Sequence, residues 1–385
     1  MKQSIIPCLV CMMIMSVRLV VAVPVEAKVQ GLYEGVCKDA KGEIKIEARV
    51  VAQGGGTYKV LVRKLATDGK VSRVELKGVT EGNTVNFNGR DGDVDWKCSY
   101  ADGAVAGTCG EGCKLDVKRV EHVSPSMGKK PPQGAVVLFN GNTTMDELVR
   151  ANGSPWYVGD KSKDGWAVWE VPIRTVVANE PGEWPCKDNV IPKDWTLGAE
   201  RRRVDTVRGI GDDGSIQVPT GGMNSKRQFE GSFDYHVEFM NPLVPNAHSQ
   251  GRGNSGVYLP NGEEIQVLDS FGECTYEGGG CGGFYKYKNP DTMDVIESIK
   301  NSSENKYTLA STPPLQWQTY DIEYRVQKKD GKYSGRPRVT VYHNGIKIHD
   351  SFEIKKDAKK GHFHFQDHGN PVRYRNIWVL PLEDQ

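Results

Sequence analysis

Residues 232–239 read SFDYHVEF, and this stretch decides how the rest of the chain is interpreted. Its apolar residues at odd positions alternate with polar ones, which is the period of a strand with one buried face. The same alternation returns at 320–326, at 339–348, where an Asn-Gly pair marks a tight hairpin, and at 362–366. Repeated alternating segments predict a sandwich of two β-sheets over residues 135–385.

A second run of short strands precedes this region. Apolar and charged residues alternate over 44–50, three glycines interrupt the pattern at 54–56, and Asp68-Gly69 is typical of a hairpin turn. This pattern predicts a small antiparallel β-domain over residues 28–123. No catalytic constellation is visible in its sequence. The segment SPSMGKKPPQG at 124–134 has the composition of an exposed linker between two separately folded domains.

The first 27 residues have the order of a secretory signal peptide. Lys2 supplies the positive charge, residues 5–15 are mostly apolar, and Val25-Glu26-Ala27 fits a cleavage site. A membrane anchor is the alternative, but Arg18 and Pro24 interrupt the apolar run, which is too short to span a bilayer. We expect a chain without a membrane span after cleavage, either secreted or in the periplasm or cell envelope.

Seven cysteines follow the predicted cleavage site: Cys37, Cys98, Cys109, Cys113, Cys186, Cys274 and Cys281. In an oxidising compartment, the four cysteines of the first domain favour two disulfides over an all-cysteine zinc site, because no histidine lies among them. In the second domain, Cys274 and Cys281 bracket a short glycine-rich loop and are the natural local pair.

The charge balance excludes one class of partner. The chain carries 50 Lys and Arg residues against 49 Asp and Glu residues, and no dense basic run interrupts this balance. A protein that binds the phosphates of a nucleic acid usually has a basic surface patch. We therefore expect no nucleic-acid partner.

Two segments contain most of the polar residues that could carry chemistry. In RGNSGVYLPNGEEIQVLDSFG, residues 252–272, Glu264 and Gln266 fall on one face of a strand, with Ile265 and Val267 on the core face. Asp269 has the wrong parity and would join Glu264 only through a β-bulge. Solvated side chains on a plain amphipathic strand are the alternative interpretation of this segment.

The second segment is GHFHFQDHGNPVRYRNIWVLPL, residues 361–382. Gln366 ends an alternating strand, and Asp367 and His368 follow it in a turn. Histidine is the side chain most easily tuned to accept and donate protons near neutral pH, although one in a turn can be purely structural.

These segments, taken in order, resemble the 3-keto-disaccharide hydrolase domain family over about 135–385. The resemblance rests on eight stretches: LFNG at 138–141, DGSIQV at 213–218, SFDYHVEF at 232–239, RGNSGVYL at 252–259, EIQVLDSFG at 264–272, CGGFY at 281–285, PPLQWQTYDIEY at 313–324 and FQDHGNPVRYRNIWVLPL at 365–382. It implies an all-β protein with a concanavalin-like jelly roll. It also implies cleavage of glycosides oxidised at C3, by hydrolysis or 1,2-elimination.

Such chemistry needs a base, an acid and donors that hold the developing oxyanion. Within the matching motifs, the candidates for catalysis are Glu264, Asp269 and His368, and the substrate is an oligosaccharide or glycoside. The candidates for substrate binding are Arg252, Asn254, Gln266, Gln366 and Asp367. The resemblance does not specify a cofactor, and a divalent metal is one candidate. The competing hypotheses are a lectin-like carbohydrate-binding protein and an envelope interaction protein.

Overall fold

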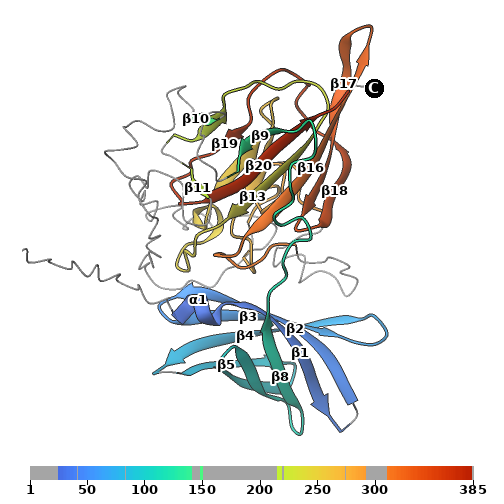
Figure 1. The fold of residues 1–385 in the computed structure, drawn as a ribbon. Coiled ribbons are helices and arrows are strands. Elements are labelled where there is room, and N and C mark those ends of the chain that lie inside the picture. Colours follow the sequence, from blue (N-terminus) through green and yellow to red (C-terminus); the bar gives the residue numbers. More distant parts are fainter. Residues whose placement is uncertain are drawn as a thin grey trace, which may run out of the picture.

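The computed structural model describes residues 25–40, 42–82, 84–140, 148–150, 215–218, 221–273, 275–291 and 310–383. The described residues form two β-domains, a barrel and a sandwich, with the barrel below the sandwich in Figure 1. The predicted all-β architecture is confirmed, including the small antiparallel domain that precedes the larger one.

The barrel begins with a short helix, α1 (Val25–Val29), and closes by pairing its first strand with its last. Each strand otherwise pairs with its neighbour in sequence. The strands are β1 (Gly31–Asp39), β2 (Gly42–Gly54), β3 (Thr57–Leu65), β4 (Val71–Glu81), β5 (Thr84–Asp91), β6 (Val94–Ala101), β7 (Ala104–Cys109) and β8 (Lys114–Val120). Closure leaves no free edge, so eight short strands form a complete domain around one core.

The sandwich consists of two sheets. One has the strand order β10-β12-β19-β14-β15, and the other has the order β11-β20-β13-β16-β17-β18, with β9 also paired to β20. The strands are β9 (Val136–Phe139), β10 (Leu148–Arg150), β11 (Ile216–Gln217), β12 (Met223–Ser225), β13 (Phe233–Met240), β14 (Ser255–Tyr258), β15 (Glu264–Val267), β16 (Gln318–Lys329), β17 (Lys332–His343), β18 (Ile346–Glu353), β19 (His364–Phe365) and β20 (Arg373–Pro381).

Aromatic side chains hold the two sheets together. Phe363, beside β19, packs against Phe233 and Tyr235 of β13, with ring centroids 5.2 and 4.4 Å apart. Phe365 meets Tyr374 of β20 at 4.9 Å. The alternating apolar residues of the sequence therefore form the core, as predicted.

The barrel docks on the sandwich through β2 and the loop after β15. The second half of β2 is buried on both faces, because one face lines the barrel and the other meets this loop. Val51 packs with Phe271, and the Arg49 guanidinium lies 4.7 Å from the centroid of the Phe271 ring. A Cβ at Gly272 would lie 2.3 Å from Val51 Cγ2, so only glycine permits this approach.

A buried ion pair completes the junction. Arg252 Nε donates to Asp269 Oδ2 at 2.7 Å, and both side chains are 0% exposed. Arg252 Nη1 also donates to the carbonyl oxygen of Ala52, in the barrel, at 3.2 Å. Nearby, Gln53 Nε2 donates to Glu273 Oε1 at 2.6 Å. The arginine therefore contacts both domains at once.

The segment predicted as an exposed linker is fastened to the sandwich. Ser124 Oγ lies 2.6 Å from Thr319 Oγ1, and the Gly128 N–H donates to Glu238 Oε1 at 2.6 Å. The Trp378 indole donates to the carbonyl oxygen of Lys129 at 3.2 Å. This cover explains why His236 and Glu238, which alternate with the core residues of β13, are buried as well.

The first domain contains one disulfide, Cys37–Cys109, so the prediction of two disulfides there is wrong. Cys98 is paired in register with Gly107, two residues along β7 from Cys109, and its Sγ faces the carbonyl oxygen of Thr108. Cys113 lies instead beside the existing bond. The two remaining thiols of the domain therefore do not meet.

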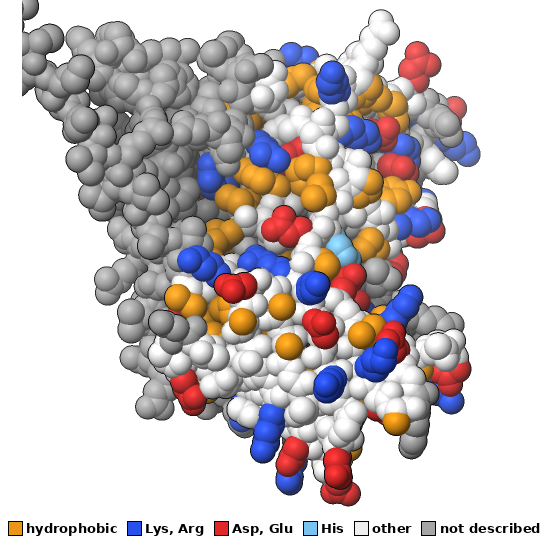
Figure 2. Space-filling model, turned by 60° about the horizontal axis from the view of Figure 1, so that its bottom comes forward, with side chains coloured by type: hydrophobic (Ala, Val, Ile, Leu, Met, Phe, Trp, Pro, Cys, Tyr) orange, Lys and Arg blue, Asp and Glu red, His pale blue; other side chains and the backbone are white. Residues whose placement is uncertain are grey.

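Several predictions fall outside the described residues. These include most of the signal peptide, Cys186, and Cys274 with its proposed partnership to Cys281. Among the described residues, no helix has the length and hydropathy needed to cross a membrane. Figure 2 views the molecule from the barrel side, where Lys and Arg side chains are interspersed with Asp and Glu.

Replacing Arg252 with Leu should destabilise the protein by about 3–5 kcal/mol, because Asp269 would stay buried without its partner. Urea denaturation measures the loss. Arg338→Leu is the matched control, since its ion pair with Glu353 is 54% exposed on both sides and should contribute about 1 kcal/mol or less. Equal losses in the two variants would contradict a structural role for the buried pair.

Candidate active site

One face of the five-stranded sheet is polar, and the strand register determines which side chains it carries. Gly256 pairs with Gln266, and Tyr258 pairs with both Glu264 and His364. These residues therefore share the face that points away from the core. The intervening residues Val257, Ile265 and Phe365 lie in the core cluster. The predicted parity of Glu264 and Gln266 is confirmed.

Glu264 lies at the centre of this polar face and is only 6% exposed. Tyr258 Oη donates to Glu264 Oε2 at 2.7 Å, and Gln366 Nε2 donates to Tyr258 Oη at 3.1 Å. Burial raises the pKa of Glu264 to about 7, although the Tyr258 hydrogen bond and the charges of Lys356 and Lys286 oppose the shift. A carboxyl group with this pKa can both accept and release a proton at neutral pH.

Gly256 makes room for that carboxylate. A Cβ at this position would lie 2.4 Å from Glu264 Oε1, which is closer than real contacts allow. Glu264 can therefore lie across the neighbouring strand rather than stand away from it. Packing against the Glu264 carboxylate therefore explains why a glycine lies in the middle of this strand.

Gln250, in the 3-10 turn Ser249–Gly251, sets the orientation of the neighbouring amides. Its Nε2 donates to Thr275 Oγ1 at 3.0 Å and to the Gly279 carbonyl oxygen at 2.8 Å. Its Oε1 must then act as an acceptor. It accepts hydrogen bonds from Gln266 Nε2 at 2.8 Å and from Asn254 Nδ2 at 3.2 Å. The NH2 groups of both amides are thus directed toward Gln250.

Three amide oxygens of this region lack a hydrogen-bond donor among the described residues. Asn254 Oδ1, Gln266 Oε1 and Gln366 Oε1 are buried and accept no hydrogen bond from the described residues. Buried acceptors are rarely left without donors. Hydroxyl groups are suitable donors, so the polar face carries acceptors of the kind that a sugar would satisfy.

The structure does not bring Asp269 and Arg252 onto this face. They form the buried ion pair described above, and Asp269 Oδ1 also accepts the Phe271 N–H at 3.1 Å. Burial raises the pKa of Asp269, against the opposing charge of Arg252. Arg252 and Asp269 thus form part of the connection between the sheet and the barrel.

Asp367 and His368 lie in the loop after β19. Asp367 accepts backbone N–H groups from Gly369 and Gly221, each at 2.8 Å, and so shapes the turn. Asn370 Oδ1 accepts the Gly253 N–H at 3.2 Å, which fastens the loop beside Asn254. His368 is partly buried, two residues beyond Gln366 on the polar face.

Four further residues lie on or beside the polar face but were not predicted as part of the site. They are Tyr258, Gln250, Asn224 and His364, and Asn224 Oδ1 lies 2.7 Å from His364 Nδ1. Tyr258 could have been found, because hairpin pairing with Glu264 follows from the short turn between their strands. Gln250 gives no sequence signal, since its role depends on Gly279, far along the chain.

Among the described residues, no three His, Cys, Asp or Glu side chains of the polar face are close enough to share one cation. The described cluster that meets this criterion lies in the barrel, at Cys37, Cys109 and Cys113.

The chain matches the model of a known protein family over the region that contains the polar face. A model of the 3-keto-alpha-glucoside-1,2-lyase-like domain matches residues 134–380. The chain belongs to this family. The resemblance noted in the sequence is thereby confirmed, and family membership supports a glycosyl hydrolase-like function with a carbohydrate as substrate class.

The solved structures that are similar include a protein of Parabacteroides distasonis provisionally described as a glycosyl hydrolase. The two share 26% sequence identity over 65% of this chain and 85% of that chain, with a TM-score of 0.42. That score reflects a loose superposition, so the family assignment rests on the domain match. A search of curated proteins gives no match.

Glu264→Gln should stabilise the protein at pH 8 by up to about 3 kcal/mol, the equivalent of raising the carboxyl pKa from 4.5 to about 7. The folded chain holds this proton more tightly than the unfolded chain. Wild-type stability therefore falls as pH rises from 4.5 to 7, and the penalty is absent below 4.5.

Thermal denaturation of both proteins at pH 4 and pH 8 measures this difference. Glu230→Gln is the matched control, because that carboxylate is 52% exposed and paired with Lys360 on the surface. A Glu264→Gln variant with no more gain at pH 8 than at pH 4 would rule out the raised pKa.

Proposed function

We propose that the protein cleaves 3-keto-glycosides, by 1,2-elimination or net hydrolysis, with Glu264 as the general base. The observation that carries the proposal is a buried carboxyl group with a pKa of about 7, held by Tyr258 on a face lined with amide acceptors. Membership of the 3-keto-alpha-glucoside-1,2-lyase-like family supports the same chemistry.

The reaction follows from the acidity of the substrate. A ketone at C3 acidifies the hydrogen on C2, which Glu264 removes to give an enolate. The electron pair then forms the C1–C2 double bond, the C1–O bond breaks, and the departing oxygen takes a proton. Addition of water across the new double bond would complete a net hydrolysis, with its proton returned to C2.

The neighbouring residues have distinct roles in this proposal. Tyr258 holds the Glu264 carboxylate toward the substrate, and its own hydroxyl is held by Gln366. We assign protonation of the leaving group to His368, which is partly buried and lies two residues after Gln366 in the loop that follows β19. Asn254, Gln266 and Gln366 would accept sugar hydroxyls through their available oxygens.

A lectin-like protein is the alternative, because amide acceptors on a β-sandwich can bind a sugar without cleaving it. The raised pKa of Glu264 favours the enzyme, since a binding site gains nothing from a carboxylate that is costly to ionise. Incubation of the protein with a 3-keto-glycoside distinguishes the two functions. Only an enzyme releases the aglycone.

Export is part of the proposal. The signal-like residues 1–27 support it, and so does the Cys37–Cys109 disulfide, because such bonds persist in oxidising compartments. Cleavage after Ala27 would divide α1 and leave Lys28 as the new terminus. The Lys28 carbonyl oxygen accepts Arg119 Nη1 at 2.7 Å, a contact that the cleaved chain keeps.

Glu264→Gln and His368→Ala should each lower turnover of a 3-keto-glycoside by roughly 100-fold or more, the usual scale for losing a general base or acid. Release of the aglycone under saturating substrate is the measurement. Glu230→Gln, on the surface, should retain full turnover. Full activity in both active-site variants, or binding without turnover in the wild type, would overturn the enzyme in favour of the lectin.

The exported chain should begin at Lys28. Intact-mass analysis of the envelope and secreted fractions checks this directly. Recovery of the uncleaved chain from the cytosol would refute export.

A further inference from the structure

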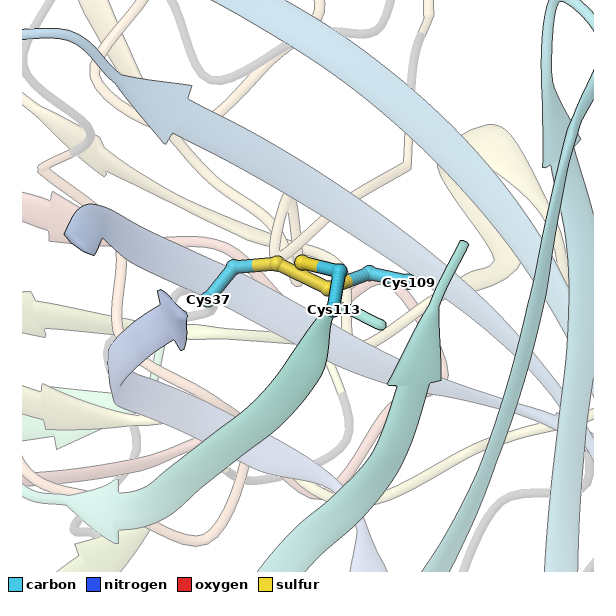
Figure 3. A group of neighbouring side chains, drawn as sticks. All are labelled: Cys37, Cys109 and Cys113. Carbon is cyan, nitrogen blue, oxygen red and sulfur yellow. A yellow bond between two sulfur atoms is a disulfide. The ribbon is translucent and has the colours of Figure 1, made fainter. Parts of the chain in front are cut away.

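Three cysteines of the barrel meet at one point outside the candidate active site. Cys37 lies in β1, Cys109 ends β7, and Cys113 immediately precedes β8. Cys37 and Cys109 form the disulfide, and the three sulfur atoms all lie within 4.8 Å of one another. Figure 3 shows the Cys113 side chain directed toward the bond between the other two.

The backbone around this group accommodates more than one pairing. The Cys109 N–H donates to the Cys113 carbonyl oxygen at 3.1 Å, so a tight turn already holds these two residues together. Cys37 is paired in register with Leu115 through the β1–β8 ladder. Neither of these main-chain contacts involves a sulfur atom, and the three sulfur atoms are already close enough for the bond to change partners.

Cys113 is also accessible, in contrast to the other thiol of the domain. Its side chain is partly exposed, while Cys98 is buried in the barrel with its Sγ toward the Thr108 carbonyl oxygen. Thiol–disulfide exchange requires a thiol within reach of a disulfide and room for it to ionise. Of the two, Cys113 is the one within reach of the disulfide and partly open to solvent. Burial and the charge of Asp39 raise the pKa of its thiol, so the exchange is expected to be slow at neutral pH.

We propose that Cys113 is the attacking thiol of an intramolecular disulfide exchange in the barrel. Its thiolate attacks Cys109 Sγ, a Cys109–Cys113 bond forms, and the Cys37–Cys109 bond breaks. The electron pair leaves on Cys37 Sγ, which takes up the proton that Cys113 released. The disulfide count is unchanged, so no external oxidant or reductant is consumed.

The two pairings have different effects on the domain. Cys37–Cys109 joins residues 72 positions apart and ties β1 to β7 across the seam where the barrel closes. Cys109–Cys113 closes only the turn between β7 and β8. A longer loop restricts the unfolded chain more, so the native barrel favours the first pairing and visits the second as the minor form.

Slow alkylation of the native full chain tests the exchange without any substitution. The protein is incubated with N-ethylmaleimide under non-denaturing conditions, quenched in acid, digested and mapped by mass spectrometry without reduction. We expect two products: Cys113 alkylated with Cys37–Cys109 intact, and Cys37 alkylated with a Cys109–Cys113 bond. The second product arises only if the disulfide has moved.

Two variants provide the controls. In Cys113→Ser, Cys37 should never be alkylated, because the attacking thiol is absent. In Cys98→Ser, both products should appear as in the wild type. Alkylation confined to Cys113 in the wild type would overturn the proposal, as would isolation of the native chain with all three cysteines reduced around a bound metal ion.

Discussion

The buried ion pair between Arg252 and Asp269 is the interaction on which the arrangement of the molecule depends. Two charges with no exposure to solvent are costly to bury, and they are tolerated only where further hydrogen bonds surround them. Here those bonds come from both domains, since the arginine reaches the Ala52 carbonyl oxygen of the barrel as well as backbone oxygens of the sandwich. The pair therefore fixes how the strand ends of the sandwich meet the barrel.

The polar face begins directly beside this junction. Gln250 lies two residues before Arg252, and it turns the amides of Asn254 and Gln266 so that their oxygens remain available. The barrel, which lies outside the matched family domain, thus supports the segment that organises the acceptors. Through these contacts the barrel can influence the geometry of the polar face.

Glu264 illustrates the conflict between stability and function at such a site. A carboxyl group with a pKa of about 7 makes the folded protein less stable at neutral pH, and burial is the cause. In the proposed mechanism the same burial favours Glu264 as a base, because its pKa lies near neutral pH. A buried carboxyl group that lowers stability in this way is usually retained only where function requires it.

The sequence was sufficient for features that depend on local periodicity. Alternation along 232–239 predicted the core of the sandwich, and strand parity placed Glu264 with Gln266. It was insufficient where contacts join distant segments. Asp269 was a catalytic candidate because of the motif that contains it, whereas its ion pair with Arg252 depends on the fold and has no local signature.

The disulfide pairing and the contacts of residues 124–134 could not be predicted for the same reason. Four cysteines allow three pairings, and only the barrel register separates Cys98 from Cys113. The composition of 124–134 suggested an exposed tether, yet its polar groups meet Glu238 and Thr319 of the seven-stranded sheet. Such hydrogen bonds between distant residues leave no periodic trace in the sequence.

The central claim is that Glu264 removes the proton from C2 of a 3-keto-glycoside. The most direct test compares turnover of that substrate with hydrogen and with deuterium at C2, at saturating concentration. The mechanism predicts slower turnover of the deuterated substrate, because the C2–H bond breaks in the chemical step. Equal rates, with release of the aglycone while deuterium stays on C2, would contradict it.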